Sequence, residues 1–117
     1  MKEMKKTINY KGKDFLLSFN LNVMEEIQNE YETIDKWGDL VYGNTNDGEP
    51  NAKAVKFGFA AMLNEGIEIE NDENGTECKP LTLKQVGRMI TEIGLHNVAD
   101  AINDTMAEST RTEEKNE

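Results

Sequence analysis

The sequence predicts an α+β fold, in which an N-terminal β-hairpin packs on a mainly helical body of four to five short helices. Residues 6–20 alternate apolar and polar side chains with the two-residue period of a half-buried strand. Most of the remaining chain repeats its apolar residues at the three- and four-residue steps of amphipathic helices. The length of 117 residues suits one domain with a hydrophobic core that needs no disulfide or metal.

The predicted hairpin spans KTINYKGKDFLLSFN, residues 6–20, and its KGKD centre supplies the glycine of a tight turn. Its apolar residues are Ile8, Tyr10, Phe15, Leu17 and Phe19. A hairpin alone is only marginally stable in water. We therefore expect helices to cover its apolar face.

A first helix is predicted to begin at Asn22, whose side chain would cap it together with Glu25, three residues later. The apolar stripe of this helix consists of Val23, Met24, Ile27, Tyr31 and Ile34. We expect the stripe to lie on the hairpin. A short second helix follows around residues 35–42; it carries the only tryptophan, Trp37, and stops at Gly43.

The most buried helix is predicted after a glycine-containing loop that ends at Asn51, its expected N-cap. Apolar residues cover most of the circumference of residues 52–66. Small residues at Gly58, Ala60 and Ala61 would let another backbone approach this helix closely.

Residues 66–80 leave two structures open. Ile67 and Ile69 alternate with carboxylates, and Asn74-Gly75 is the strongest short hairpin-turn signal in the chain, which favours a small β-ribbon. The density of acidic and amide side chains is equally typical of a solvated acidic loop.

Two further helices are predicted near the C-terminus. Thr82 and Gln85 form a second capping box, and Gly94 ends the helix that they begin. The apolar residues of this helix are Leu83, Val86, Met89, Ile90 and Ile93. The last helix is expected to run from about Asn97. Because no apolar residue follows in the last stretch, we expect residues 1–108 to form a single domain and residues 109–117 a disordered acidic tail.

The charge and composition exclude several classes of function. The net charge of −10 and the pI near 4.6 argue against binding to a phosphate backbone. One cysteine, Cys78, and one histidine, His96, cannot supply a zinc cage. The longest apolar stretch, residues 57–63, is about a third of a membrane span. We therefore expect no nucleic acid, no membrane, no metal and no cofactor.

No catalytic residues are predicted either. The chain has no nucleophile elbow and no phosphate-binding glycine loop, and its carboxylates lie in polar surroundings that are typical of solvated faces. The acidic stretch from Glu70 to Glu77 resembles part of a calcium loop, but the position that needs a bidentate carboxylate is Leu81. Since the first residues, MKEMKK, are followed by polar ones rather than by the apolar core of an export signal, we expect a cytoplasmic protein.

A helix-turn-helix regulator is a weaker interpretation of residues 82–106. Its second helix would have to meet phosphates with cations, yet the ionisable residues from Asn97 to Glu108 are Asp100, Asp104 and Glu108, with no Lys or Arg. The sign of the charge therefore disfavours DNA binding.

The methionines point instead to a partner polypeptide. Met24, Met62, Met89 and Met106 are distributed over four predicted helices, and flexible thioethers either fill a core or line surfaces that accommodate another chain. So few elements cannot hide every apolar position, and surplus stripe would mark a partner groove. The predicted partner-binding residues are Met24, Ile27, Tyr31, Met89, Ile90 and Ile93.

The order of the sequence segments resembles a known family. GKDFLLSFNLNVMEEIQNEY is followed by WGDL, a variable loop, NAKAVKFGFAAMLNEG and LTLKQVGRMITEIG. Over residues 6–108 this pattern is similar to the tail assembly chaperones of long-tailed phages and prophages of low-GC Gram-positive bacteria. The similarity lies in the overall pattern, because the family has no catalytic signature.

The resemblance implies a non-enzymatic protein that binds and solubilises the tape-measure protein during tail morphogenesis. It also implies help in recruiting the tail-tube protein, self-association, a mainly helical fold, a place in the cytoplasm of the bacterial host, and absence from the mature virion. No binding residues carry over position by position. Two other classes stay open: a structural phage protein, such as a connector or minor tail component, and the small helix-turn-helix regulator.

Overall fold

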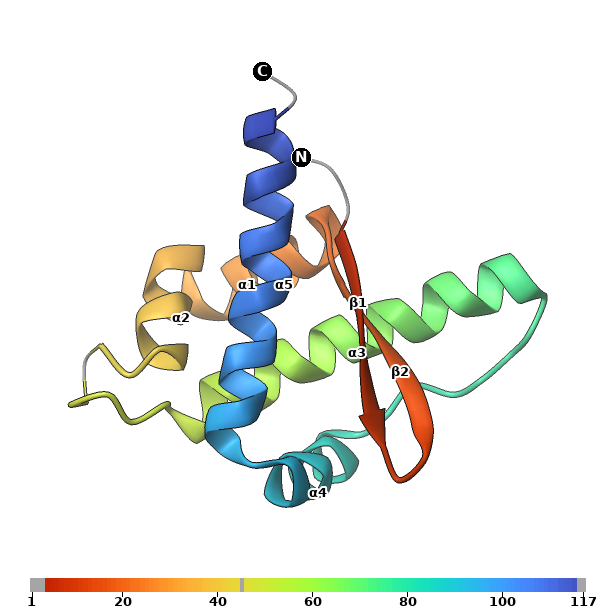
Figure 1. The fold of residues 1–117 in the computed structure, drawn as a ribbon, viewed down its shortest axis with the longest axis horizontal. Coiled ribbons are helices and arrows are strands. Elements are labelled where there is room, and N and C mark those ends of the chain that lie inside the picture. Colours follow the sequence, from red (N-terminus) through yellow and green to blue (C-terminus); the bar gives the residue numbers. More distant parts are fainter. Residues whose placement is uncertain (1–3, 45, 116–117) are drawn as a thin grey trace.

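A computed structural model describes residues 4–44 and 46–115, with side chains over residues 6–44 and 46–107. In these residues an antiparallel two-stranded hairpin is followed by five helices, so the α+β prediction is confirmed (Figure 1). The hairpin consists of β1 (Met4–Tyr10) and β2 (Lys13–Phe19).

The turn of the hairpin explains its register. Lys11 and Gly12 both have positive φ, 53° and 79°, the backbone that matches the twist of a two-residue hairpin. Ile8 therefore lies opposite Phe15 and shares one face of the hairpin with Tyr10, Phe15, Leu17 and Phe19, whereas Leu16 lies on the other face. The predicted hairpin is confirmed, and the end of β2 is buried at Leu17.

The first helix, α1 (Leu21–Tyr31), begins two residues earlier than predicted. Its N-cap is Asn20, whose side chain accepts a hydrogen bond from the Val23 amide at 3.2 Å. Asn22 lies inside the helix, where its amide donates to Glu65 at 3.0 Å. Two asparagines two residues apart have the same capping chemistry. Asn20 is the cap because it directly follows the last residue of β2, Phe19, so the helix begins as soon as the strand ends.

The second and third helices lie on either side of the loop over residues 43–51, of which Thr45 falls outside the described residues. The short helix α2 (Ile34–Val41) is confirmed. The long helix α3 (Ala52–Asn74) begins as predicted at Asn51, whose side chain accepts from the Ala54 amide at 2.9 Å.

The continuation of α3 corrects both predictions for residues 66–80. The helix runs to Asn74, and Gly75 ends it in the left-handed conformation, with a φ of 66°. Asn-Gly serves a helix end as well as a hairpin turn, since both need a residue with positive φ. Two alternating isoleucines, Ile67 and Ile69, are too few to separate a strand from the last turns of a helix.

Two asparagines of α3 hold the linker that follows it. The Asn71 side chain accepts from the Cys78 amide and donates to the Cys78 carbonyl, both at 3.0 Å. The Asn64 side chain makes the same pair of bonds to Leu81, at 2.8 and 3.1 Å. Seven residues are about two turns, so Asn64 and Asn71 lie on one face of the helix. We call this arrangement the asparagine clasp.

The clasp leads the chain into α4 (Leu83–Ile93). Its N-terminus has the predicted capping box, because Thr82 accepts from the Gln85 amide at 3.1 Å while the Gln85 side chain accepts from the Thr82 amide at 2.8 Å. Gly94 ends the helix, also as predicted.

The last helix, α5 (Leu95–Lys115), starts at Leu95 rather than at Asn97, since Gly94 alone separates it from α4. It continues past Glu108, whereas the sequence predicts a disordered segment from residue 109. The lack of apolar residues argues only against packing, and a helix propagates through its own backbone bonds. The division into residues 1–108 and 109–117 stays a prediction, and residues 116 and 117 lie outside the described residues.

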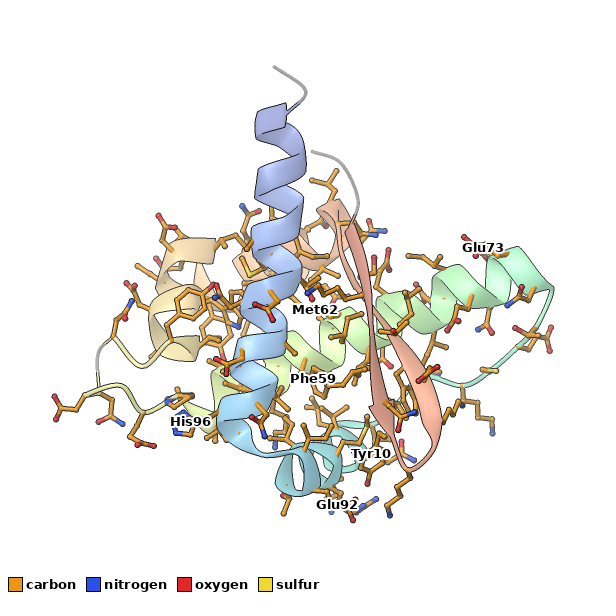
Figure 2. All side chains as sticks on the ribbon, viewed as in Figure 1. Tyr10, Phe59, Met62, Glu73, Glu92 and His96 are labelled. Carbon is orange, nitrogen blue, oxygen red and sulfur yellow. The ribbon has the colours of Figure 1, made fainter. Side chains whose placement is uncertain are left out.

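The core surrounds α3, which contacts α1, α2, α4, α5 and β2. Phe59 and Met62 of α3 lie at the centre of the molecule (Figure 2). The largest fully buried side chains are Trp37, Phe59, Leu17, Ile27, Met62, Leu63 and Ile102.

Two glycines of α3 let neighbouring elements approach its backbone. A Cβ at Gly58 would overlap the indole ring of Trp37, and a Cβ at Gly66 would overlap the backbone carbonyl of Leu16 in β2. The Trp37 indole also donates to the Ala54 carbonyl at 2.9 Å. The sequence predicts a backbone against the small residues near Gly58, but the structure places a ring there and a backbone two turns later.

We predict that Gly58→Ala destabilises the fold. The added methyl group has no space beside the fully buried Trp37 ring, so overpacking should lower the free energy of unfolding by about 1–3 kcal/mol. Without this overlap, replacing a glycine inside a helix by alanine would raise the free energy of unfolding by about 1 kcal/mol. Urea unfolding monitored by Trp37 fluorescence measures the difference, and a variant as stable as the parent would contradict the close contact.

Carboxylates gather where α1 meets α3. Burial, followed by the charges of Glu65 and Glu68, raises the pKa of Glu26. Glu65 itself accepts from the Asn20 side-chain amide at 2.6 Å, which fixes its charge near the N-terminus of α1. The ionised form of Glu26 is therefore less favourable in the folded chain than in the unfolded chain.

We predict that Glu26→Gln raises the melting temperature at pH 7 and not at about pH 4. A raised folded-state pKa means that ionisation destabilises the fold: the penalty is absent below the unfolded pKa and complete above the folded one. The gain should be small, because Glu26 is exposed. Glu25→Gln, which removes the same charge from the adjacent exposed position, is the control. Equal gains for both variants would argue against the Glu26 contact.

Candidate functional site

The structure places the six predicted partner-binding residues in two separate groups. Ile27, Met89 and Ile90 are buried, whereas Met24, Tyr31 and Ile93 are partly buried. The helix α1 packs on α2, α3 and β2, whereas α4 packs on α3 and α5. The two predicted stripes therefore do not form one continuous surface (Figure 1).

The α1 residues serve mainly the interior. Ile27 is fully buried, and the Tyr31 ring meets Phe57 edge-on with centroids 5.6 Å apart. The Tyr31 hydroxyl is buried without a hydrogen-bond partner among the described residues. Burial is the main cause that raises the pKa of Tyr31, and the charge of Glu30 raises it further. The sequence predicts that the stripe of α1 lies on the hairpin and that three of its residues also bind a partner; in the structure α3 and β2 cover much of this stripe.

Of the predicted α4 residues, Met89 and Ile90 lie beside solvent-accessible hollows. Two hollows flank this helix, and Thr91 contributes to both. Ile90 lies in the wall of one hollow and Met89 in the wall of the other, each with only a small exposed fraction. Of the two predicted stripes, the one on α4 is therefore the one that borders accessible surface.

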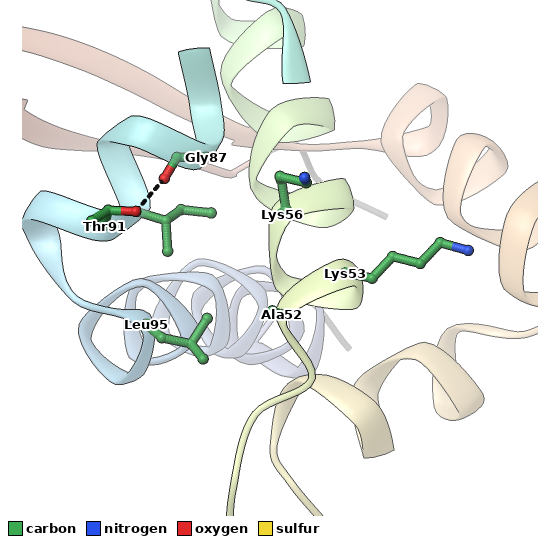
Figure 3. Close-up of a pocket in the computed structure, with 7 residues that line it drawn as sticks. Ala52, Lys53, Lys56, Gly87, Thr91 and Leu95 are labelled. Carbon is green, nitrogen blue, oxygen red and sulfur yellow. Dashed lines mark hydrogen bonds between the residues drawn. The ribbon is translucent and has the colours of Figure 1, made fainter. Parts of the chain in front are cut away.

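The larger hollow, which we call the α3–α4 groove, has a volume of about 550 Å³ and is open along one side (Figure 3). It lies between the first turns of α3, the exposed side of α4 and the start of α5. Its lining residues are Ala52, Lys53, Lys56, Gly87, Ile90, Thr91 and Leu95.

The surface of the groove is mainly apolar. Ile90 and Leu95 contribute aliphatic side chains, and the Thr91 hydroxyl donates to the Gly87 carbonyl at 2.9 Å, so it is already satisfied within α4. The Lys53 chain extends away from α4 (Figure 3), and its ammonium lies 3.8 Å from Glu30. Lys56 is the cation that remains beside the groove.

The second hollow, between the hairpin and α4, has a volume of about 460 Å³. Tyr10 and Phe15 of the hairpin form its aromatic wall. The Lys11 ammonium lies 3.6 Å from Glu92 and 5.4 Å from the centre of the Tyr10 ring. Lys11 thus links the tip of the hairpin, near Tyr10, to Glu92 of α4 (Figure 2), and Glu92 foremost raises the pKa of Lys11.

Unpaired cations surround the exposed side of α4. Lys84 and Arg88 project from this helix and Lys56 faces it from α3, and none of the three forms an ion pair with a side chain that the structure describes. By contrast, Lys36 is the lone cation of residues 21–49, a segment rich in carboxylates. A chain of net charge −10 therefore presents a locally cationic, apolar surface.

The glycine within α4 is the feature that sequence analysis missed. In the described helices, Gly58 and Gly66 are needed for close contacts, but a Cβ at Gly87 would meet only the flexible Lys56 chain, at an ordinary 3.6 Å. A glycine inside a helix costs about 0.5–1 kcal/mol relative to alanine. Its position in the middle of a strongly amphipathic pattern was the available signal.

The other candidate features are a metal site, a membrane-spanning helix, His96 and Cys78. Among the described residues, no cluster of three or more His, Cys, Asp or Glu side chains has the geometry to hold a metal ion. Membrane-spanning character is likewise absent from every helix in the described part of the chain. His96 lies 3.6 Å from Glu49, and Cys78 is an exposed free thiol in the linker.

We predict that Gly87→Ala stabilises the chain, with the opposite sign to Gly58→Ala. The methyl group would make an ordinary van der Waals contact with the Lys56 chain and the helix gains the propensity of alanine, so the free energy of unfolding should rise by about 0.5–1 kcal/mol. Urea unfolding of both variants under one set of conditions measures this. A loss of stability in Gly87→Ala would mean that the groove is closed in solution.

Comparison with known proteins adds no constraint on the site: no family model, no curated protein and no solved structure matches the chain. Any function must therefore be argued from its own residues and geometry.

Proposed function

We propose that the chain is a non-enzymatic tail assembly chaperone of a long-tailed phage or prophage. It binds the tape-measure protein in the host cytoplasm while the tail is built, and it leaves before the virion is mature. Its other partners are the tail-tube protein and further copies of itself. It uses neither a cofactor nor a metal.

The observation that carries the proposal is the pair of open hollows beside α4. A long helical client displays apolar faces that must be kept from aggregating before assembly, and amphipathic helices bind in apolar grooves of this kind. The α3–α4 groove offers Ile90 and Leu95 to such a face, and the second hollow offers Tyr10 and Phe15. The sequence pattern of residues 6–108, which resembles the chaperone family, supports the same function.

The size of the hollows fits reversible binding. Burial of apolar surface is worth about 25 cal/mol per Å². Lost translational and rotational freedom costs about 4–15 kcal/mol, so one groove alone holds a helix weakly. Many copies along one client would bind through avidity and still be displaced one at a time.

The charge of the chain suits a protein that coats another. Carboxylates dominate α1 and the second half of α3, away from the cationic side of α4. A net charge of −10 keeps loaded complexes apart through like-charge repulsion. The client is therefore held on the one side while the remaining surface maintains solubility.

We predict that Leu95→Glu impairs the binding of the tape-measure protein, whereas Leu21→Glu does not. Leu95 and Leu21 are the first residues of α5 and α1, where a carboxylate is tolerated by the helix dipole. Only Leu95 lines the α3–α4 groove, and Leu21 is 69% exposed. The measurement is the yield of soluble tape-measure protein when each variant is co-expressed with it.

The expected result is soluble client with the parent chain and with Leu21→Glu, and aggregated client with Leu95→Glu. Client solubility that does not depend on the chain would contradict the proposal, as would equal loss with both variants. Detection of the chain in purified phage particles would favour a structural component instead. A salt-dependent shift of DNA would favour the regulator.

A further inference from the structure

The α3–α4 groove contains a glycine that no contact within the described chain explains. Gly58 and Gly66 lack side chains because Trp37 and Leu16 occupy the space, but Gly87 faces only the end of a mobile lysine chain. Glycine at an exposed helical position allows a second backbone to approach closely. The fold itself does not use this approach.

The charges around Gly87 restrict what could approach. Lys84 and Arg88 are exposed on the same helix, and Lys56 lies across the groove with its Cδ 3.6 Å from the position of a Gly87 Cβ. The carboxylate of α4, Glu92, is already engaged by Lys11. Lys56 therefore lines an apolar groove, Lys84 lies one turn before Gly87 on the same helix, and Arg88 lies in the wall of the second hollow. None of the three forms an ion pair with a described side chain, and together they are complementary to a partner with carboxylates beside its apolar face.

We propose that the α3–α4 groove binds an acidic amphipathic helix of the client, with the client helix packed closely over Gly87 and its carboxylates facing Lys56 and Lys84. This inference rests on the proposed function and names the chemistry of the segment that is bound. The apolar face of the client covers Ile90 and Leu95. A client segment whose flanks are basic is repelled.

A helix fits these observations better than nucleic acid does. A phosphate backbone would leave Ile90 and Leu95 in contact with charged oxygens, and the chain as a whole repels polyanions. A peptide helix satisfies its own backbone, so it can present apolar side chains to the groove and carboxylates to the cations at its edge.

The test uses labelled peptides of about 18 residues, which form a helix about 27 Å long. All share one leucine and alanine face, and their flanking positions hold glutamate, glutamine or lysine. Binding to the full chain is measured by fluorescence anisotropy. We expect the glutamate peptide to bind about tenfold more tightly than the lysine peptide at about 50 mM salt, and the ratio to shrink at about 500 mM.

Two sets of variants locate the site. Gly87→Leu places a side chain in the groove, where its Cβ meets only the flexible Lys56 chain at an ordinary 3.6 Å, so it should keep the fold, as judged by melting temperature, and abolish binding of the glutamate peptide. The double variant Lys56→Glu and Lys84→Glu should reverse the preference and bind the lysine peptide. Lys36→Glu, on α2 and away from the groove, is the matched control that should change neither.

Each alternative outcome contradicts the inference. Equal binding of the three peptides would show an apolar site without charge selection, and unchanged binding by folded Gly87→Leu would place the site elsewhere. Tighter binding of a single-stranded oligonucleotide, or sedimentation showing that a second copy occupies the groove, would assign it another partner. If the peptide tests fail while co-expression still yields soluble client, the proposed function stands and this inference falls. If the peptide tests succeed while the chain has no effect on client solubility, the groove binds helices but the chaperone role is wrong.

Discussion

The architecture depends on how closely other elements approach the axis of α3. Gly58 and Gly66 are eight residues apart, which is about 12 Å along a helix and about 80° around it. One admits the Trp37 ring of α2, and the other admits the backbone of β2. The hairpin, which would be unstable alone, is thereby fixed to the same helix that anchors the tryptophan. With the Trp37 ring and β2 packed against α3, the first part of this helix still has one face available for contact with α4 and α5.

Much of this fold could be predicted from the sequence, because its signals are local. The Lys11-Gly12 turn and the Thr82 capping box involve residues at most three apart, and both were correct. The errors arose where one local pattern serves two structures. Asn74-Gly75 suits a helix end and a hairpin turn alike, and only the contacts of α3 with the linker decide between them.

The candidate site was harder to predict for a different reason. Periodicity shows that α1 and α4 each have an apolar face, but it does not show which face another element covers. In the structure α3 and β2 cover much of the α1 face, while α4 keeps open space beside Met89 and Ile90. Lys56 and Gly87 are far apart in sequence, and the groove between them exists only because α3 and α4 pack side by side.

The asparagine clasp has a consequence for how freely the linker can vary. Asn64 and Asn71 bond to backbone atoms of Leu81 and Cys78, so they fix the path of the linker mainly through its backbone. Asn71 also accepts a hydrogen bond from the Thr76 hydroxyl at 2.8 Å. Both clasped residues must offer an amide hydrogen, which excludes proline there, whereas Pro80 stands at a position from which neither asparagine takes a bond. Related chains could therefore exchange almost any other residue in this segment and still deliver α4 to the same place.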